Sequence, residues 1–208
     1  MKREDLRYMR TEDAIQTAFF ECVRTVGYEK TNVALLCRLA NINRKTFYDH
    51  YLDKEDLLDN LYRKMEKSLI NTMKEISINK FDMARYYTMS NPFIYNIAEN
   101  SQLFVALHKC YPRRVTDVFI KLYKHNMQLL IPDFEQTFAK EPFIKARFEY
   151  GAGGTVRLIS EWFVKERAST INDLTSTCNR LWKTTSNAIL QHIASIDPSS
   201  VSGLNLKI

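Results

Sequence analysis

The most informative residue types and spacings of this chain lie in one short stretch, between Thr31 and Lys54. The sequence of that stretch, TNVALLCRLANINRKTFYDHYLDK, predicts two short helices joined by a tight turn. The second helix would carry side chains that can donate hydrogen bonds to base edges or phosphate oxygens: Arg44, Lys45, Thr46, Tyr48 and His50. The spacing is typical of a DNA-binding helix-turn-helix, whose second helix lies in a major groove.

Two helices that cross closely need suitable residues at three points. A small residue must stand where the axes approach, and Cys37 or Ala40 meets this requirement. The turn needs a residue that tolerates a positive φ, which Asn41 does at modest cost. An apolar residue must anchor the second helix, and Phe47 is the one that would face inward. We therefore expect Phe47 in the core and Asn41 in a left-handed conformation.

Further helices must hold this pair in place. Apolar residues of the preceding segment recur with the spacing of one helical stripe: Ile15, Ala18, Phe19, Cys22, Val23 and Val26. We expect Thr11 to cap that helix and Gly27 to end it. Asn32, Asn43 and Asp53 are placed to cap the three helices that follow.

The rest of the chain is also predicted to be helical, so we expect an all-α protein. Prolines mark helix starts or breaks, and no β alternation of useful length occurs. The last helix should open at Thr170, with Asp173 completing a capping box. The expected domains are a helix-turn-helix domain at 1–60, with its motif at about 33–52, a helical domain at 61–196, and a mobile tail at 197–208.

Composition excludes several classes of function. The net charge of +6 suits an acidic partner, but residues 1–54 hold ten Lys or Arg against eight Asp or Glu, a net charge of only +2. The four cysteines lack a zinc-ligand spacing, and neither a phosphate loop nor a GxSxG motif occurs. We therefore expect no enzyme, no metal and no cofactor. No apolar run approaches the ~18 residues of a membrane span and no signal peptide is present, so we expect a cytoplasmic protein.

From Thr11 to about Leu61 the sequence resembles the N-terminal domain of the TetR family of bacterial transcription regulators. Two positions depart from the family pattern, because Cys37 stands where Ala is commoner and Asn41 where Gly is commoner. Both substitutes are compatible with the packing and the turn. The matching residues occur in the family's order with no insertion or deletion between them: Gly27-Tyr28-Glu29-Lys30-Thr31, Leu36-Cys37, Ala40, Asn43-Arg44, Thr46-Phe47-Tyr48, His50-Tyr51 and Lys54-Glu55-Asp56-Leu57-Leu58.

The resemblance implies particular DNA contacts. Arg44 and Lys45 lie in the first turn of the second helix, where long donors can reach base edges. Thr46 would contact a base or a phosphate, while Tyr48 and His50 would contact phosphates. Two more phosphate contacts are implied at the starts of neighbouring helices: Asn32 and Lys54. In the alternative interpretation, Asn32 and Asn43 are only helix caps and His50 only titrates at the surface.

The resemblance also implies a larger helical domain that dimerises and often binds a small effector. Three glycines in EYGAGGT, within the penultimate helix, indicate a close approach by a partner helix or a ligand, since each costs ~1 kcal/mol relative to Ala. This region more weakly resembles a TetR branch found near dihydroxyacetone kinase genes. We expect the last two helices to form a four-helix bundle with a second copy, or alternatively to pack within one chain. The predicted dimer residues are Gly151, Gly154, Leu174, Leu181, Thr185 and Ala188.

These patterns predict a sequence-specific, DNA-binding transcription regulator. We expect a homodimeric repressor that binds a near-palindromic site in double-stranded DNA and responds to a small-molecule effector. Tyr and Phe residues between about 81 and 130 could line an effector pocket, although an ordinary helical core is the favoured interpretation. The alternative is a TetR-like co-regulator that acts through a protein partner and binds DNA weakly or not at all. Either protein would lie in the bacterial cytoplasm, a repressor in association with the nucleoid.

Overall fold

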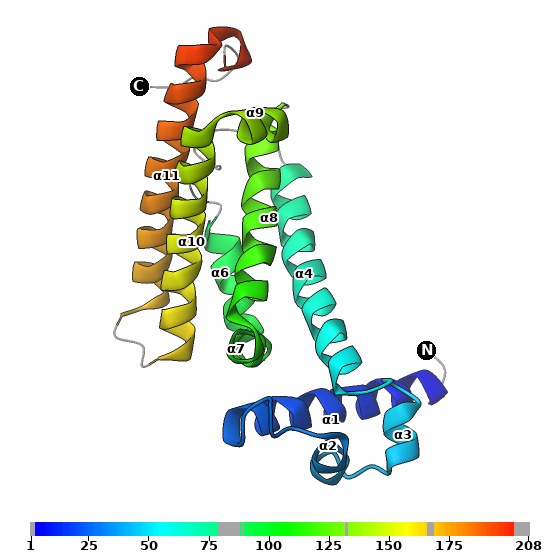
Figure 1. Ribbon diagram of the computed structural model, residues 1–208. Coiled ribbons are helices and arrows are strands. Elements are labelled where there is room, and N and C mark those ends of the chain that lie inside the picture. The colour runs from blue at the N-terminus through cyan, green and yellow to red at the C-terminus, as the bar shows by residue number, and fades with distance from the viewer. Residues whose placement is uncertain (1–2, 79–87, 89, 132, 166–168, 202–208) are drawn as a thin grey trace. The chain divides into compact units, whose positions relative to one another are not determined.

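The computed structural model describes residues 3–78, 88, 90–131, 133–165 and 169–201 (Figure 1). All regular elements in these ranges are helices, which confirms the all-α prediction. The chain divides into two compact units, one of Met1–Lys67 with Asn100–Pro112, the other of Ser68–Glu99 with Arg113–Ile208. Within the described ranges, no helix is both long and apolar enough to cross a membrane.

The first unit consists of three helices, the start of a fourth and one helix from later in the chain. The elements are α1 (Arg3–Thr25), α2 (Val33–Leu39), α3 (Arg44–Tyr48), the beginning of α4 (Lys54–Ile78), and α7 (Ser101–Cys110). Its core contains fully buried side chains from each of the first four helices: Ile15, Phe19, Leu36, Phe47, Leu57 and Leu61. Five residues of the predicted apolar stripe therefore face the core: Ile15, Ala18, Phe19, Cys22 and Val23. The sixth, Val26, follows the end of α1 and is 42% exposed, so its inclusion was wrong.

The later helix α7 joins this unit through contacts that are distant in sequence. The Tyr62 hydroxyl on α4 donates to the carbonyl of Leu107 at 2.9 Å, and it lies 3.1 Å from the carbonyl of Tyr111. The ring of Tyr111 also packs edge-on against Tyr28, with 5.6 Å between centroids. The compact unit consequently extends beyond residue 60, to Lys67, and includes α7.

The prediction that Thr11 caps α1 is wrong, because α1 already begins at Arg3. Thr11 lies inside the helix, where its hydroxyl donates to the Arg7 carbonyl at 3.0 Å. The preceding residues include neither Gly nor Pro, so nothing prevents the helix from extending toward the N-terminus. At the other end Gly27 adopts a φ of 83° just after the helix ends at Thr25, as the sequence predicted.

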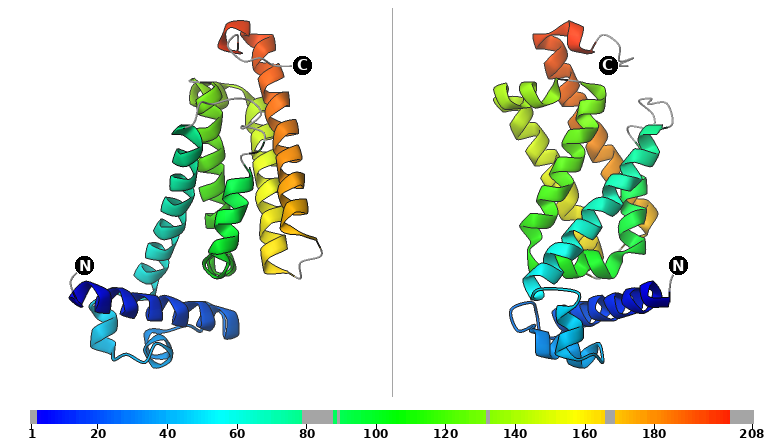
Figure 2. Two further views of the ribbon diagram at one scale, coloured as in Figure 1. Left: turned by 180° about the vertical axis from the view of Figure 1, so that it is seen from behind. Right: turned by 90° about the vertical axis from the view of Figure 1, so that its right-hand side faces the viewer.

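The second unit is also helical. It contains the rest of α4, α6 (Ser90–Glu99), α8 (Pro112–Leu130) from Arg113 onward, α9 (Phe134–Lys140), α10 (Pro142–Val164), α11 (Ile171–Ile196) and a 3-10 helix at Pro198–Val201. Helices α10 and α11 run side by side through most of their length (Figures 1 and 2). The predicted capping box of Thr170 and Asp173 is present at the start of α11.

Aromatic residues fill the interior of this unit. The ring of Tyr123 on α8 stacks on Trp182 of α11 with 4.4 Å between centroids. Phe148 of α10 meets the same indole edge-on at 6.1 Å. Of the segment predicted to be a mobile tail, residues 198–201 form the 3-10 helix with Val201 buried, and residues 202–208 lie outside the described ranges.

Candidate nucleic-acid interface

The turn between α2 and α3 has the geometry that the sequence predicted. Asn41 has a φ of 53°, and no other described residue except Gly27 has a positive φ. The N–H of Ile42 donates to the Cys37 carbonyl at 3.0 Å, which closes the turn. Asn tolerates the left-handed conformation because its short polar side chain adds little steric cost. Cys37 is 6% exposed and allows the two helices to approach closely.

Side-chain caps fix where α2 and α3 begin. Asn32 Oδ1 accepts a hydrogen bond from the N–H of Leu35 at 3.0 Å. Asn43 Oδ1 accepts from the N–H of Thr46 at 2.8 Å and from its hydroxyl at 3.1 Å. Both asparagines therefore act as caps, as predicted, and both remain exposed. Thr46, a predicted DNA contact, is half-buried as a residue, and its hydroxyl bonds to its own cap Asn43.

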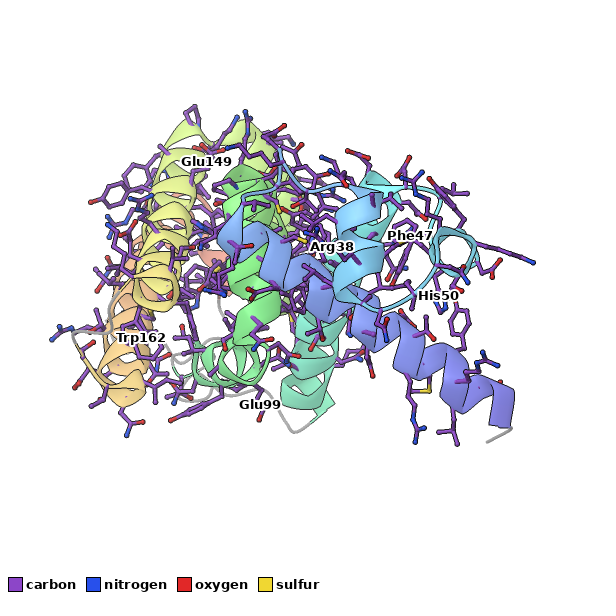
Figure 3. All side chains as sticks on the ribbon, turned by 90° about the horizontal axis from the view of Figure 1, so that it is seen from below. Arg38, Phe47, His50, Glu99, Glu149 and Trp162 are labelled. Carbon is purple, nitrogen blue, oxygen red and sulfur yellow. The ribbon has the colours of Figure 1, made fainter. Side chains whose placement is uncertain are left out.

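The recognition helix α3 has one buried side and one exposed side. Phe47 is fully buried and anchors the helix, as predicted (Figure 3). Arg44 and Lys45 are exposed, and neither forms an ion pair with any residue that the structure describes. Tyr48 is 53% exposed. Of the predicted DNA contacts on α3, Arg44, Lys45 and Tyr48 are thus exposed to solvent.

His50, which follows the recognition helix, is held by an aromatic contact from α1. Its ring stacks on Tyr8 with 3.9 Å between centroids and an interplanar angle of 22°. Nδ1 is buried and has no hydrogen-bond partner among the described residues. Burial lowers the pKa of His50 below its ordinary value, against the smaller opposing effect of the Glu12 and Asp49 carboxylates. The imidazole is therefore held in its neutral form more strongly than in the unfolded chain.

Acidification should reduce stability through His50. Its pKa is lowered on folding from about 6.5, so the unfolded state binds more protons in the window below that value. The free energy of unfolding should fall as the pH falls through this window, and recover as the pH rises above it. Urea unfolding at about pH 7.5 and about pH 5.5 should show a larger loss in the wild type than in His50→Asn. Equal losses would mean that folding leaves the pKa of His50 unchanged.

Lys54, the predicted phosphate contact at the start of α4, is engaged within the unit. Its ammonium lies 3.3 Å from the Tyr28 carbonyl, 4.4 Å above the Tyr28 ring and 3.9 Å from the Glu55 carboxylate. The side chain is only 19% exposed. Asp53 caps this helix as predicted, with Oδ1 accepting from the N–H of Asp56 at 2.7 Å. To reach a phosphate, the Lys54 ammonium would have to leave the Tyr28 carbonyl.

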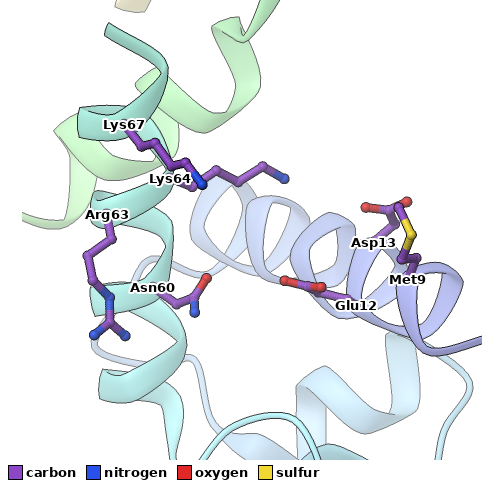
Figure 4. A pocket seen from close by; sticks show the side chains of 7 residues that line it. All are labelled: Met9, Glu12, Asp13, Asn60, Arg63, Lys64 and Lys67. Atoms are coloured by element: carbon purple, nitrogen blue, oxygen red, sulfur yellow. The ribbon is translucent and has the colours of Figure 1, made fainter. Parts of the chain in front are cut away.

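The sequence reasoning missed a polar cluster in which Gln16 and Tyr51 are buried, Glu12 is half-buried and Lys64 is exposed. We call it the Gln16 network, made of Glu12, Gln16, Tyr51 and Lys64, and it lies where α1 meets α4. Gln16 is 4% exposed and accepts from the Lys64 ammonium at 2.7 Å. A groove of about 410 Å³ opens beside it, lined by Met9, Glu12, Asp13, Asn60, Arg63, Lys64 and Lys67 (Figure 4). The signal available in the sequence was Gln16, a polar residue three positions before Phe19 and therefore on the same side of α1.

The residues predicted for a dimer interface fall into two groups in the second unit. Leu174 and Thr185 are buried, at 6% and 4% exposure, against their own chain. Gly151 faces Thr185, because a Cβ added at this glycine would lie 2.8 Å from the Cβ of Thr185. The remaining residues lie at the surface of the unit, with Gly154 and Leu181 exposed and Ala188 half-buried. These three and the half-buried Gly151 retain exposed surface in the single chain.

Comparison with known sequences supports the helix-turn-helix assignment. Residues 17–61 match the model of the family described as bacterial regulatory proteins, tetR family. A curated relative, the uncharacterized HTH-type transcriptional regulator YxbF of Bacillus subtilis (strain 168), is 27% identical over 150 residues. That match covers 62% of this chain and 40% of YxbF, so the chain spans less than half the length of this relative.

Three solved structures share the fold over most of the chain. A putative TetR-family regulator from Syntrophomonas wolfei str. Goettingen has a TM-score of 0.63 at 19% identity, over 84% of this chain and 93% of its own. The fatty acid degradation regulator FadR from Bacillus halodurans has a TM-score of 0.63 at 14% identity, over 83% and 94%. The dihydroxyacetone kinase operon activator DhaS has a TM-score of 0.53 at 19% identity, over 84% and 94%.

The fold and the exposed recognition helix define an all-α helix-turn-helix protein. Residues 17–61 match the tetR family of bacterial regulatory proteins, and the chain shares its fold with a solved putative TetR-family regulator. Members of this class are regulators rather than enzymes.

Proposed function

We propose that this protein is a sequence-specific DNA-binding transcription regulator that acts as a homodimer. The observation that carries the proposal is the arrangement of α3, where Phe47 is buried while Arg44, Lys45 and Tyr48 face solvent. Because Arg44 and Lys45 form no ion pair with any described residue, they can exchange solvent for phosphate and base acceptors at little cost. The family match over residues 17–61 covers this helix and supports the assignment.

We assign the predicted contacts to two tasks. Arg44 and Lys45 would read base edges, since both lie in the first turn of α3 and are exposed. Phosphate contacts would fix the register, through side chains of α3 and the starts of its neighbouring helices. These phosphate contacts are Asn32, Thr46, Tyr48, His50 and Lys54. Thr46 and Lys54 would have to give up hydrogen bonds to Asn43 and Tyr28 respectively.

The direct test is a binding selection with the purified protein on genomic fragments at physiological salt. Enrichment of a near-palindromic motif would support the proposal, because a two-fold symmetric dimer places its recognition helices about 34–36 Å apart. A folded protein that enriches no motif would favour the alternative, a co-regulator that works through a protein partner. The modest net charge of +2 in residues 1–54 is the observation that favours this alternative.

Arg44→Ala should weaken binding to the selected site more than binding to random DNA. A bidentate contact from Arg to guanine supplies about 1–3 kcal/mol of discrimination, so we expect roughly a tenfold loss or more in the ratio of the two affinities. Fluorescence anisotropy with both DNAs at matched salt measures this ratio. Arg24→Ala removes an equal charge from the far end of α1, where Arg24 pairs with Glu21, and should leave the ratio unchanged. Equal losses on both DNAs from Arg44→Ala would rule out base reading by this residue.

The proposed dimer uses the accessible residues beside the seam between α10 and α11. Gly154 lies three residues after Gly151, and Leu158 follows one turn later at 40% exposure. On α11, Leu181 is also 40% exposed and Ala188 stands two turns further on. Small residues next to exposed leucines suit the close packing of helices in a four-helix bundle. We therefore place the two-fold interface on Gly154, Leu158, Leu181 and Ala188.

We further propose control by a small effector bound in the second unit. Asn126 on α8 is fully buried, and neither atom of its carboxamide has a hydrogen-bond partner among the described residues. A buried amide of this kind is satisfied by water or by a ligand. The buried polar side chains described in this unit are all uncharged, which favours a neutral effector. We propose repression as the output, although the related structure of DhaS is that of an operon activator.

A further inference from the structure

The Gln16 network joins three parts of the first unit through one buried carboxamide. Gln16 Oε1 accepts from the Lys64 ammonium at 2.7 Å, and Gln16 Nε2 donates to Glu12 at 3.2 Å. The same Nε2 lies 3.4 Å from the hydroxyl of Tyr51, which in turn donates to Glu12 at 3.3 Å. Figure 4 shows Lys64 extending from α4 toward α1, which carries Glu12. The amide of Gln16 is thus shared between α4 and the segment after the recognition helix.

Tyr51 connects this network to the recognition helix. Its N–H donates to the Phe47 carbonyl at 2.9 Å, and its ring lies 5.9 Å from the Phe47 ring. Tyr51 is 3% exposed, so its position is set by buried contacts rather than by solvent. It directly follows His50, which is proposed to contact a phosphate. A displacement of the Tyr51 hydroxyl would therefore move the C-terminal end of α3 and His50 with it.

Lys64 connects the network to a helix that belongs to both units. Helix α4 is continuous from Lys54 to Ile78, and the boundary between the two units falls after Lys67. A rotation or a shift of α4 would carry the Lys64 ammonium away from Gln16. The part-buried Gln16 oxygen would then lose its charged donor, so the network favours one orientation of α4 over others.

We propose that Gln16 is a positioning residue for DNA recognition, which sets the end of the recognition helix relative to α4 through Tyr51 and Lys64. This inference rests on the proposed DNA-binding function. Gln16 touches no DNA in this proposal. Its effect passes through the orientation of α3, so its loss should reduce discrimination between specific and random DNA while random binding changes little.

The test replaces Lys64 by Met, which keeps the length of the side chain but removes the ammonium. We expect the ratio of affinities for the selected site and for random DNA to fall about tenfold, which corresponds to about 1.4 kcal/mol. Lys67→Met is the matched control, because Lys67 lies on the same helix and lines the same groove without a hydrogen bond to Gln16. Lys67→Met should weaken binding to the selected site and to random DNA by the same factor. Lys64→Arg, which keeps a donor in place, should restore the ratio.

A second variant tests the other side of the network. Gln16→Glu still accepts from Lys64, but it cannot donate to Glu12 or Tyr51 and places two carboxylates together. It should lower the affinity ratio as Lys64→Met does. In both variants the NMR signals of the His50 ring in the free protein should shift, whereas Lys67→Met should leave them in place. This spectroscopic result does not depend on DNA.

The outcomes separate this inference from the proposed function. If the wild type selects no DNA motif, the proposed function fails, whatever the variants do. If the wild type selects a motif and Lys64→Met and Gln16→Glu both keep the wild-type affinity ratio, the positioning role is wrong while DNA binding stands. Unchanged His50 signals in both variants would also overturn it, because they would show that the network does not reach the end of α3.

Discussion

Leu181→Glu should convert the protein to a monomer and reduce its affinity for the selected DNA site by about 10²–10⁴-fold. Once one subunit of a dimer has bound its half-site, the other subunit binds the second half-site intramolecularly. This linkage raises the affinity by about 10²–10⁴-fold. A carboxylate at position 181 would be desolvated within the proposed interface, which opposes association. Leu181 is 40% exposed in the chain alone, so the substitution should leave the fold of each copy intact.

Sedimentation and DNA binding measured on the same sample would check this result. Ser176→Glu is the matched control, because Ser176 is an exposed residue of α11 that lies outside the proposed interface. It introduces the same charge on the same helix and should leave both the dimer and the affinity unchanged. If Leu181→Glu remains dimeric, the interface lies elsewhere on the chain. If it becomes a monomer with unchanged affinity, half-site linkage does not contribute to binding.

Gly151→Ala should lower the free energy of unfolding by about 1–3 kcal/mol, the usual cost of an extra methyl group in a packed core. The added Cβ would overlap the side chain of Thr185 and lie 2.8 Å from its Cβ. Thr185 is 4% exposed and β-branched, so it has little freedom to move aside. The cost should also exceed the gain in helix propensity from replacing glycine by alanine.

Gly153→Ala provides the matched control on the same helix. A Cβ there would meet no atom within 4 Å, so the substitution should stabilise the protein by about 0.5–1 kcal/mol through helix propensity alone. Urea unfolding of both variants compares the two effects directly. A gain in stability from Gly151→Ala would show that α10 and α11 are not packed closely at this point. Because both variants replace glycine by alanine in α10, they share the same change in helix propensity, and the difference between them measures the contact of residue 151 with Thr185.

The glycine cluster shows how far sequence reasoning reached in the second unit. The sequence correctly indicated a close approach at EYGAGGT, because three glycines in a helix interior carry a clear cost. It did not indicate which glycine is in contact. Gly151 faces Thr185, whereas a Cβ at Gly153 or at Gly154 would meet no atom of the described residues within 4 Å. Only the rotation of α10 against α11 distinguishes these positions.

Lys54 makes the same point for the candidate site. Its position at the start of α4 was predictable, because Asp53 is a good cap and the apolar pattern begins just after it. The direction of its ammonium was not, since Tyr28 lies far back in the sequence and meets Lys54 only in the folded unit. The start of a helix can be predicted from residues within one turn of it. The partners of a side chain depend on tertiary packing and cannot be predicted in this way.

The sequence by itself determined the helix-turn-helix, because its signals are local. Asn41 makes the turn, Asn32 and Asn43 cap the helices, and Phe47 anchors α3, each through contacts within a few residues or through apolar periodicity. The tertiary structure decided the Gln16 network, in which partners far apart in sequence meet: Tyr51 and Lys64 reach Gln16 from 35 and 48 residues away. Such contacts depend on how whole helices cross, and residue periodicity carries no information about the crossing.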